Sequence, residues 1–417
     1  MSVMLPINEV VESVSITHKF DKPVLKFLNT SDVENGKIIN VNHLPIEELK
    51  GQAKKTIKKH DILFSEIRPK NRRFAYVDFD DTYDFVVSTK LMVLRKFNPN
   101  VDNKYFYYFL TNDHMLSILQ DRAENRIGSF PQITFDLLSE YSIRVPHISE
   151  QQKIASVLSA LDSKIEINNR INAELEAMAK TIYDYWFVQF DFPDKNGKPY
   201  KSSGGKMVWN EELKREIPEG WHVKSIEDCC KIIGCLHSKK PDTNFESEKY
   251  YLLQLENLLD NGLIDVSNKY YVSRDEYSKW TSRIEVKEHD ILITNAGRVA
   301  ATTQVPEEIL TGIGRNITAI RPISISPTYL FLSFRGIDIV KQIKSNTDSG
   351  AFFSSFNVKG IKRLNFLIPS HKIESDFEKV VYPIRRKREI NLMESQQLAS
   401  LRDWLLPMLM NGQVKVN

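Results

Sequence analysis

One long polar stretch, residues 149–187, limits what this chain can fold into more than any other feature. Its apolar residues recur at alternating steps of four and three, which is the spacing of a coiled-coil seam. The seam positions are Ile154, Leu158, Leu161, Ile165, Leu175, Met178, Ile182 and Trp186, with Asn168 and Asn172 in the two positions between. Ser149 and Gln152 have the spacing of a capping box, which predicts that the helix starts at Ser149. A helix with so narrow an apolar stripe needs a partner stripe.

The partner stripe lies in the same chain, 223 residues further on. Shifting the first seam by that number leads to Phe377, Val381, Ile384, Asn391, Leu398, Leu401 and Leu405. Of these only Asn391 is polar, and it corresponds to Asn168 inside matching Glu-Ile-Asn triplets. We expect the two asparagines to act as polar layers that set the helix register at some cost in stability. The chain therefore holds two copies of a unit that ends in a seam helix.

The segments before the seam helices repeat as well. The tetrapeptide His-Asp-Ile-Leu occurs at residues 60–63 and again at 289–292. In the first copy, apolar runs predict strands at 61–68, 74–79 and 85–94, and a helix is predicted at 102–121. We expect an α+β fold with mixed domains at 1–148 and 221–371, seam helices at 149–187 and 372–417, and a connector at 188–220.

Bulk composition is that of a soluble globular chain with more than one domain. The 417 residues are 41% hydrophobic and 27% charged. No apolar run is long enough to span a membrane and no signal pattern opens the chain, so we expect a cytoplasmic protein. The net charge of +3 permits a nucleic-acid partner, but any basic surface has to be local.

The expected catalytic motifs are missing. The sequence contains no P-loop, no complete dinucleotide fingerprint, no His-Glu-x-x-His and no Gly-x-Ser-x-Gly. Cys229, Cys230 and Cys235 lie close to His237, but the adjacent pair does not have a usual zinc spacing, so buried thiols are the better interpretation. These absences favour a binding protein, and the alternative is an enzyme with an unfamiliar site.

Basic residues stand in loops at matching places of the two copies, which favours contact with DNA. Lys and Arg neutralise phosphates, and Arg and Asn read base edges. For any single residue, a solvated surface remains the alternative. The candidates are Arg68, Lys70, Arg72, Arg73 and Arg126 in the first copy, and Arg298, Arg315 and Asn316 in the second.

Aromatic residues cluster at the ends of the seam helices and in the connector. They either close the helix end or form a docking surface for another subunit, and the sequence leaves both open. The docking candidates are Tyr183, Trp186, Phe187, Phe192 and Trp404.

Several long motifs resemble those of one known family. They include Glu-Gln-Gln-Lys-Ile at 150–154, Tyr-Asp-Tyr-Trp-Phe at 183–187, Ile-Pro-Glu-Gly-Trp at 217–221 and Leu-Arg-Asp-Trp-Leu-Leu-Pro at 401–407. On these residues the chain resembles the specificity (S) subunits of type I restriction-modification systems over essentially its whole length. The competing hypothesis is a coiled-coil scaffold whose domains bind protein, or a restriction-associated DNA-binding protein without active partners.

The resemblance implies a fold and a division of labour. Two target-recognition domains would each read one half of a bipartite, asymmetric DNA site, and an antiparallel pair of seam helices would separate them. Methylation and cleavage would belong to partner methyltransferase subunits, two in number, and to restriction subunits. The chain itself would hold no cofactor or metal, since S-adenosylmethionine, ATP and magnesium would be used by those partners.

Overall fold

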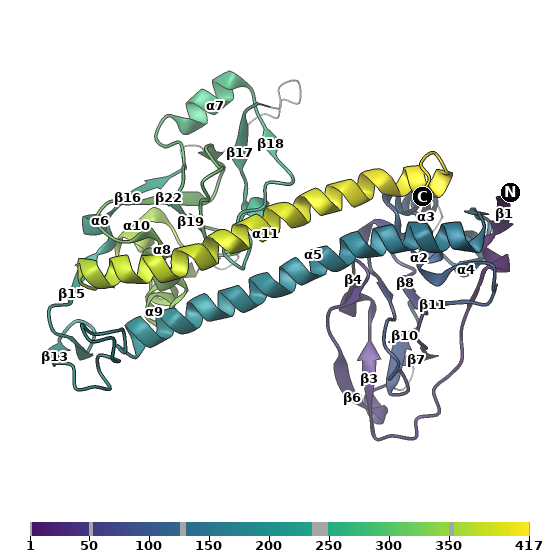
Figure 1. Cartoon of the computed structure of the whole chain (residues 1–417), viewed down its shortest axis with the longest axis horizontal. Helices are drawn as coiled ribbons and strands as arrows, with labels where there is room; N and C mark the ends of the chain where they lie inside the picture. Colours follow the sequence, from purple (N-terminus) through teal and green to yellow (C-terminus); the bar gives the residue numbers. More distant parts are fainter. Residues whose placement is uncertain (1, 50–52, 126–130, 236–248, 350–353, 417) are drawn as a thin grey trace. The chain divides into compact units, whose positions relative to one another are not determined.

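The computed structural model describes residues 2–49, 53–125, 131–235, 249–349 and 354–416. Within these ranges the chain forms two compact units. The first unit consists of Met1–Ile165 with Gln397–Asn417, and the second is Glu166–Gln396. Each unit combines a globular α+β part with a stretch of each of two long helices (Figure 1).

The two long helices are α5 (Ile148–Tyr183) and α11 (His371–Asn411), 36 and 41 residues long. They are the predicted seam helices, and they pair antiparallel. In the second unit the Asn172 Oδ1 accepts a hydrogen bond from Asn391 at 2.9 Å, while the Asn172 Nδ2 donates to the Arg388 carbonyl at 3.0 Å. Asn168 donates to Glu394 at 2.8 Å. A polar layer is therefore present, and Asn391 pairs with Asn172 within it.

The predicted seam is wrong at one position near the C-terminal end of each helix. Met178 and Leu401 are 44% and 43% exposed. The inward position passes to their neighbours: Ala179 is buried, and Arg402 bonds to Asp162 of α5 at 2.7 Å. An α-helix with 3.6 residues per turn drifts about 20° per heptad from a strict seven-residue repeat. The apolar stripe therefore moves onto the next residue by the end of each helix.

The predicted capping box at Ser149 is absent because the backbone becomes helical one residue earlier, at Ile148. The Ser149 hydroxyl instead lies 2.8 Å from the His147 ring. Gln151, which is fully buried, ties this first turn to the domain. Its Nε2 donates to the carbonyls of Asn100 and Pro146, at 2.9 and 2.8 Å. The helix start is thus fixed by a buried glutamine.

The first unit contains two four-stranded sheets. The central, antiparallel one has the order β2 (Val11–Ser13), β11 (Leu91–Lys96), β8 (Ile62–Ser65), β9 (Phe74–Tyr76). The other has the order β6 (Asn42–Pro45), β3 (Val24–Leu28), β10 (Phe85–Ser88), β7 (Ala53–Thr56), with β3 and β10 parallel. The remaining strands are β1 (Val3–Pro6), which pairs with β12 (Ser142–Val145), and β4 (Val33–Glu34), which pairs with β5 (Lys37–Ile38). The helices are α1 (Ile46–Leu49), α2 (Asn103–Thr111), α3 (Asp113–Glu124) and α4 (Phe135–Ser139), with 3-10 turns η1 (Ile7–Glu9), η2 (Thr30–Asp32) and η3 (Pro69–Asn71).

The second unit repeats this topology. Its central sheet has the order β16 (Cys230–Gly234), β22 (Ile317–Pro322), β19 (Ile291–Thr294), β20 (Thr302–Gln304). A second sheet has the order β18 (Tyr270–Tyr271), β17 (Tyr251–Leu253), β21 (Gly312–Ile313), with β17 and β21 parallel. The two-stranded pairs are β15 (His222–Ser225) with β25 (Asn365–Ile368), β13 (Met207–Asn210) with β14 (Arg215–Pro218), and β23 (Asp348–Ser349) with β24 (Ser354–Ser355). The helices are α6 (Ile226–Cys229), α7 (Arg274–Thr281), α8 (Pro327–Arg335), α9 (Ile337–Ser345) and α10 (Val358–Lys362), with a π-helical turn η4 (Asp184–Val188) after α5 and the 3-10 turn η5 (Leu255–Asn257).

A buried ion pair confirms that the two units are copies of one fold. Asp61 precedes β8 and takes both carboxylate hydrogen bonds from Arg95 of β11, at 2.8 and 2.7 Å. Asp290 precedes β19 and takes the same two bonds from Arg321 of β22, at 2.8 and 2.6 Å. Each aspartate is 1% exposed. The His-Asp motif found in the sequence therefore marks the same structural position twice.

Two predicted elements of the first copy are each divided in the structure. The apolar run 85–94 forms two strands, β10 and β11, which belong to different sheets. The helix predicted at 102–121 is interrupted at Asn112, whose side chain accepts a hydrogen bond from the Met115 amide at 2.8 Å and so caps α3. Asparagine competes with the helical backbone in this way, which explains the interruption.

A buried acid lies in the first turn of α11. Glu374 is 6% exposed and lies near Glu378, whose carboxylate accepts hydrogen bonds from Ser326 and Thr328 at the start of α8. Burial is the main reason, and the Glu378 charge a lesser one, why the pKa of Glu374 is raised to about 7.

We expect Glu374→Gln to stabilise the second unit at pH 8 by about 1–3 kcal/mol and to change its stability little at pH 4. The pKa of Glu374 is higher in the folded protein than in the unfolded chain, so the folded state loses stability as the pH rises from the unfolded pKa to the folded one. Glutamine cannot ionise and therefore avoids this loss. Thermal unfolding at both pH values measures the effect, with the exposed Glu211→Gln as control. An equal shift at pH 4 and pH 8 would contradict the assignment.

None of the helices within the described residues combines the length and the apolar character needed to cross a membrane.

Candidate nucleic-acid interface

Two loops meet at one end of the central sheet in each unit. In the first unit, the loop between β8 and β9 meets the loop between β10 and β11, where the Glu66 amide donates to the Lys90 carbonyl at 3.0 Å. In the second unit, the Asn295 amide donates in the same way to the Asn316 carbonyl at 2.7 Å. The two units therefore hold corresponding loops in the same arrangement.

A third segment joins each pair of loops. The Ile133 amide donates to the Glu66 carbonyl at 2.8 Å, and the Gln132 side chain donates to the Glu66 carboxylate at 2.6 Å. In the second unit the Phe356 amide donates to the Asn295 carbonyl at 2.8 Å. Each unit thus presents three converging loops on a rigid sheet. We call each set a loop triad. Arg126, another DNA candidate, lies outside the described residues.

Four of the sequence-predicted residues are exposed on the loop triads. Arg68 directly precedes the η3 turn and Lys70 lies within it, and Arg68 adopts a left-handed backbone conformation with a φ of 47°. Arg315 and Asn316 stand in the loop before β22, with Asn316 at a φ of 59°. Lys70 has one weak ionic partner, Asp121 at 4.0 Å. These side chains are placed where a ligand can reach them.

Two other predicted residues are held by the fold. The Arg73 Nη1 donates to the carbonyls of Ser31 and Val33, at 3.3 and 3.4 Å. Arg298 donates to the carbonyls of Leu255 and Leu258 and pairs with Asp260 at 2.6 Å. In each unit an arginine from the turn of the central hairpin therefore secures the adjacent 3-10 turn.

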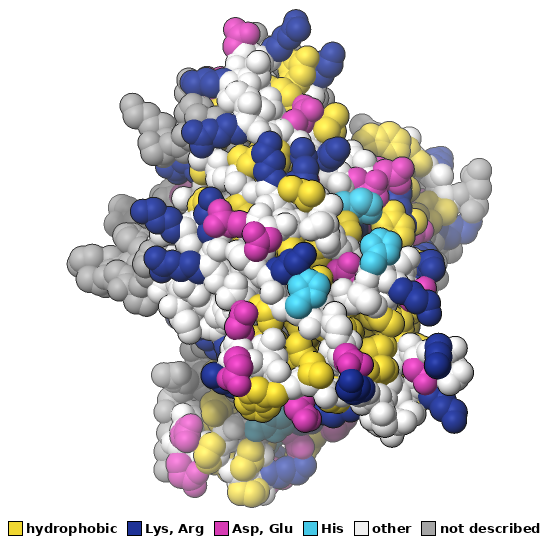
Figure 2. All heavy atoms as spheres, turned by 90° about the vertical axis from the view of Figure 1, so that its left-hand side faces the viewer, with side chains coloured by type: hydrophobic (Ala, Val, Ile, Leu, Met, Phe, Trp, Pro, Cys, Tyr) yellow, Lys and Arg dark blue, Asp and Glu magenta, His cyan; other side chains and the backbone are white. Residues whose placement is uncertain are grey.

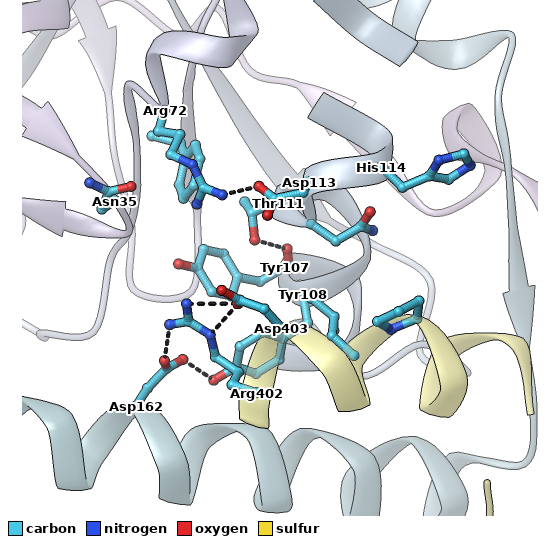
Figure 3. A pocket seen from close by; sticks show the side chains of 14 residues that line it. Asn35, Arg72, Tyr107, Tyr108, Thr111, Asp113, His114, Asp162, Arg402 and Asp403 are labelled. Carbon is cyan, nitrogen blue, oxygen red and sulfur yellow. Dashed lines mark hydrogen bonds and ion pairs between the residues drawn. The ribbon is translucent and has the colours of Figure 1, made fainter. Parts of the chain in front are cut away.

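Arg72 lies apart from the exposed group, at a cavity of about 330 Å³ in the first unit (Figure 3). It is ion-paired with Asp113 at the start of α3. On the other side of the cavity, Asp162 accepts hydrogen bonds from Arg402 at 2.7 Å and from Tyr108 at 2.6 Å. The prediction that Arg72 contacts DNA therefore requires its pair with Asp113 to open.

The sequence interpretation missed Lys90. Its carbonyl makes the hydrogen bond that corresponds to that of Asn316, so it stands at the equivalent place in the first unit. The Lys90 side chain is half exposed and lies 3.7 Å from Glu66. The available signal was its position directly before the strand that matches β22.

The docking candidates divide into buried and exposed residues. Tyr183, Trp186, Phe187 and Phe192 are 9%, 8%, 3% and 4% exposed and pack in the core of the second unit. They close the end of α5, which is the alternative that the sequence left open. Trp404 is 62% exposed. Whether any of the five contacts a partner remains a prediction.

The charge on the surface is mixed. Figure 2 shows Lys and Arg side chains interspersed with acidic ones over the face it presents, in agreement with the net charge of +3.

Cys229 and Cys230 are buried, and burial raises the pKa of the Cys230 thiol. His237 lies outside the described residues. No cluster of His, Cys, Asp and Glu suited to a metal ion occurs in the described ranges.

Comparisons with known proteins agree on one family. Residues 5–177 match the model of the type I restriction modification DNA specificity domain. The type I restriction enzyme HindI specificity subunit of Haemophilus influenzae is 28% identical, and the match covers 96% of this chain and 97% of that protein. Residues 5–177 thus carry the match to a type I DNA specificity domain, and the chain as a whole is similar to type I specificity subunits. The MjaIX specificity subunit of Methanocaldococcus jannaschii is 26% identical over 76% of this chain and 70% of its own length.

The fold of this chain is also seen in a crystal structure. The S subunit of a type I restriction-modification system from M. genitalium aligns with a TM-score of 0.52 at 16% identity, over 98% of this chain and 96% of that chain. The α+β fold with a long helical coiled coil is thus the fold expected from the sequence.

Proposed function

We propose that this chain is a type I specificity subunit, a non-catalytic DNA-recognition chain whose two loop triads each read one half of a bipartite, asymmetric site. The observation that carries this proposal is the repeated triad. The backbone hydrogen bonds are the same in both units, while the exposed side chains differ: Arg68, Lys70 and Lys90 in one, Arg315 and Asn316 in the other. Loops with the same backbone arrangement but different exposed side chains suit two DNA half-sites of different sequence.

The proposal assigns residues 1–148 and 221–371 as the target-recognition domains. It assigns adenine methylation and cleavage to methyltransferase and restriction subunits that the chain directs to DNA, with two methyltransferase copies per chain. Those subunits would use S-adenosylmethionine, ATP and magnesium. We expect the complex to act in the cytoplasm, where the DNA lies.

Co-expression with the methyltransferase subunit of the same system tests the function directly. We expect methyl-adenine, mapped across the host genome, to appear in a gapped two-part motif only when this chain is present. An ungapped motif, or the same motif without the chain, would overturn the proposal. A scaffold without DNA recognition would show no DNA affinity that falls with salt.

We expect Arg68→Ala to weaken recognition of one half-site by about 1–3 kcal/mol if Arg68 contacts a base in two places. The measurement is fluorescence anisotropy with duplexes in which either half-site is scrambled. Lys195→Ala, an exposed cation of the connector, is the control. An equal loss on every duplex would make Arg68 a phosphate contact and remove it from the specificity set.

A further inference from the structure

The two units have cavities at equivalent positions. The first, of about 330 Å³, lies where α2 gives way to α3, beside residue 162 of α5 and residues 402–407 of α11 (Figure 3). The second, of about 660 Å³, lies where α8 gives way to α9, beside residues 176–184 of α5 and 381–388 of α11. The sequence offset of 223 carries Asp162 of the first cavity to Arg385 of the second. The repeated fold therefore leaves the same hollow twice.

The linings of the two cavities differ. The charged side chains that line the first cavity are already paired with one another, Asp162 with Arg402 and Arg72 with Asp113. The second has mainly apolar walls, and Ile337 at its lining is 58% exposed. Its apolar lining includes Phe331, Ile337 and Val340.

Positive charge exceeds negative charge at the second cavity. Arg335, Arg385 and Arg388 all line it. Glu176 is shared between Arg335 at 2.5 Å and Arg388 at 2.8 Å. Glu389 is shared between Arg385 at 2.7 Å and the neighbouring Arg386 at 3.3 Å. The three lining guanidinium groups thus draw on two carboxylates. Arg386, the other partner of Glu389, has its own pair with Glu308, and Lys180 at the lining is paired with Asp184.

Two of these arginines keep unused hydrogen-bond donors in spite of deep burial. Arg385 and Arg388 are 5% and 4% exposed. The Arg385 Nη1 and the Arg388 Nε find no acceptor in the part of the chain that the structure describes. A buried donor left unsatisfied is costly, and more so on a charged group. Both donor atoms are closed off from the cavity in this conformation, so a carboxylate entering it would offset the guanidinium charges and would accept these hydrogen bonds once the guanidinium groups rotate.

We propose that this second cavity is a docking site for a segment of a partner polypeptide that presents one carboxylate beside an apolar side chain. The carboxylate complements the arginine excess, and the apolar side chain packs against Phe331, Ile337 and Val340. The lining favours a polypeptide over a small molecule, because Ile337 is 58% exposed and an occupant therefore has to cover an apolar side chain that is open to solvent as well as fill the cavity. The inference rests on the proposed function, which makes the methyltransferase subunit the partner.

The test uses the full chain co-expressed with the methyltransferase subunit, with bound copies counted by native mass spectrometry. Ile337→Glu adds a negative charge at an exposed position of the lining, and Arg335→Glu reverses a lining charge. We expect each variant to lose one methyltransferase copy or to bind it at least tenfold more weakly. The exposed Lys387→Gln on the same helix is the matched control and is expected to keep the wild-type ratio. Thermal unfolding confirms that the variants are folded.

The outcomes separate the inference from the function it rests on. If the unaltered chain binds no methyltransferase subunit, the proposed function fails and the inference fails with it. If the unaltered complex forms and folded Ile337→Glu keeps every copy at the same affinity, only the docking site is refuted. Dodecanoate is the probe for the other occupant. If it binds with a dependence on Arg335 while methyltransferase binding ignores both variants, the cavity is a small-molecule site and the inference is overturned.

Discussion

Replacing Asp61 with alanine is expected to destabilise the first unit by about 3–5 kcal/mol, and Asp290→Ala is expected to do the same to the second unit. Each carboxylate is 1% exposed and takes two hydrogen bonds from one arginine. Each also caps the preceding turn, since the amides of Lys58 and Lys287 donate to it at 2.6 and 3.0 Å. Removing the aspartate leaves the arginine charge without its partner. Hydrogen–deuterium exchange in β8 and β19 measures the loss for each unit separately.

The exposed pair of Lys59 with Asp80 provides the control, because the Asp80 side chain is 85% exposed. Asp80→Ala is expected to cost no more than about 1 kcal/mol. If Asp61→Ala costs no more than Asp80→Ala, the buried pair is not a stabilising part of the repeated fold. A loss of protection in β19 caused by Asp61→Ala would show that the units do not unfold independently.

The repeat could be predicted from the sequence because it depends on side chains that the fold needs twice. Apart from Met178 and Leu401, the seam residues and the aspartate of the His-Asp motif serve contacts inside the fold, and such contacts restrict which residues can replace them. Their spacing therefore survives in the sequence and identifies both copies, and the structure confirms this in the matching sheets and ion pairs.

The roles of individual loop residues could not be predicted in the same way. Arg73 belongs to the same basic run as Arg68, and Arg298 stands in the corresponding loop of the second copy, yet both guanidinium groups meet backbone carbonyls at the 3-10 turns. The path of the loop decides whether an arginine reaches a carbonyl or solvent, and no local pattern encodes that path. Lys90 was missed for the same reason, since its position is defined by a hydrogen bond to a distant loop.

Replacing Phe187 with alanine is expected to destabilise the second unit by about 3–5 kcal/mol. The side chain is 3% exposed, and its ring centroid lies 4.5 Å from that of Tyr329 and 4.8 Å from that of Phe377. These neighbours come from α8 and α11, so Phe187 joins the end of α5 to both helices. Alanine would leave a cavity among three elements. Chemical denaturation followed by tryptophan fluorescence measures the change.

Trp404→Ala is the complementary change, because Trp404 is 62% exposed and its loss is expected to alter stability by no more than about 0.5 kcal/mol. The two variants separate the roles that the sequence left open for these aromatic residues. If the aromatic cluster closes the helix end, Phe187→Ala lowers stability whether or not the methyltransferase subunit is present. If Phe187→Ala instead reduces methyltransferase binding while stability stays unchanged, docking is its main role. If Trp404 lies on a docking surface, Trp404→Ala reduces methyltransferase binding and leaves stability unchanged, because its ring contributes little to the core of its own chain.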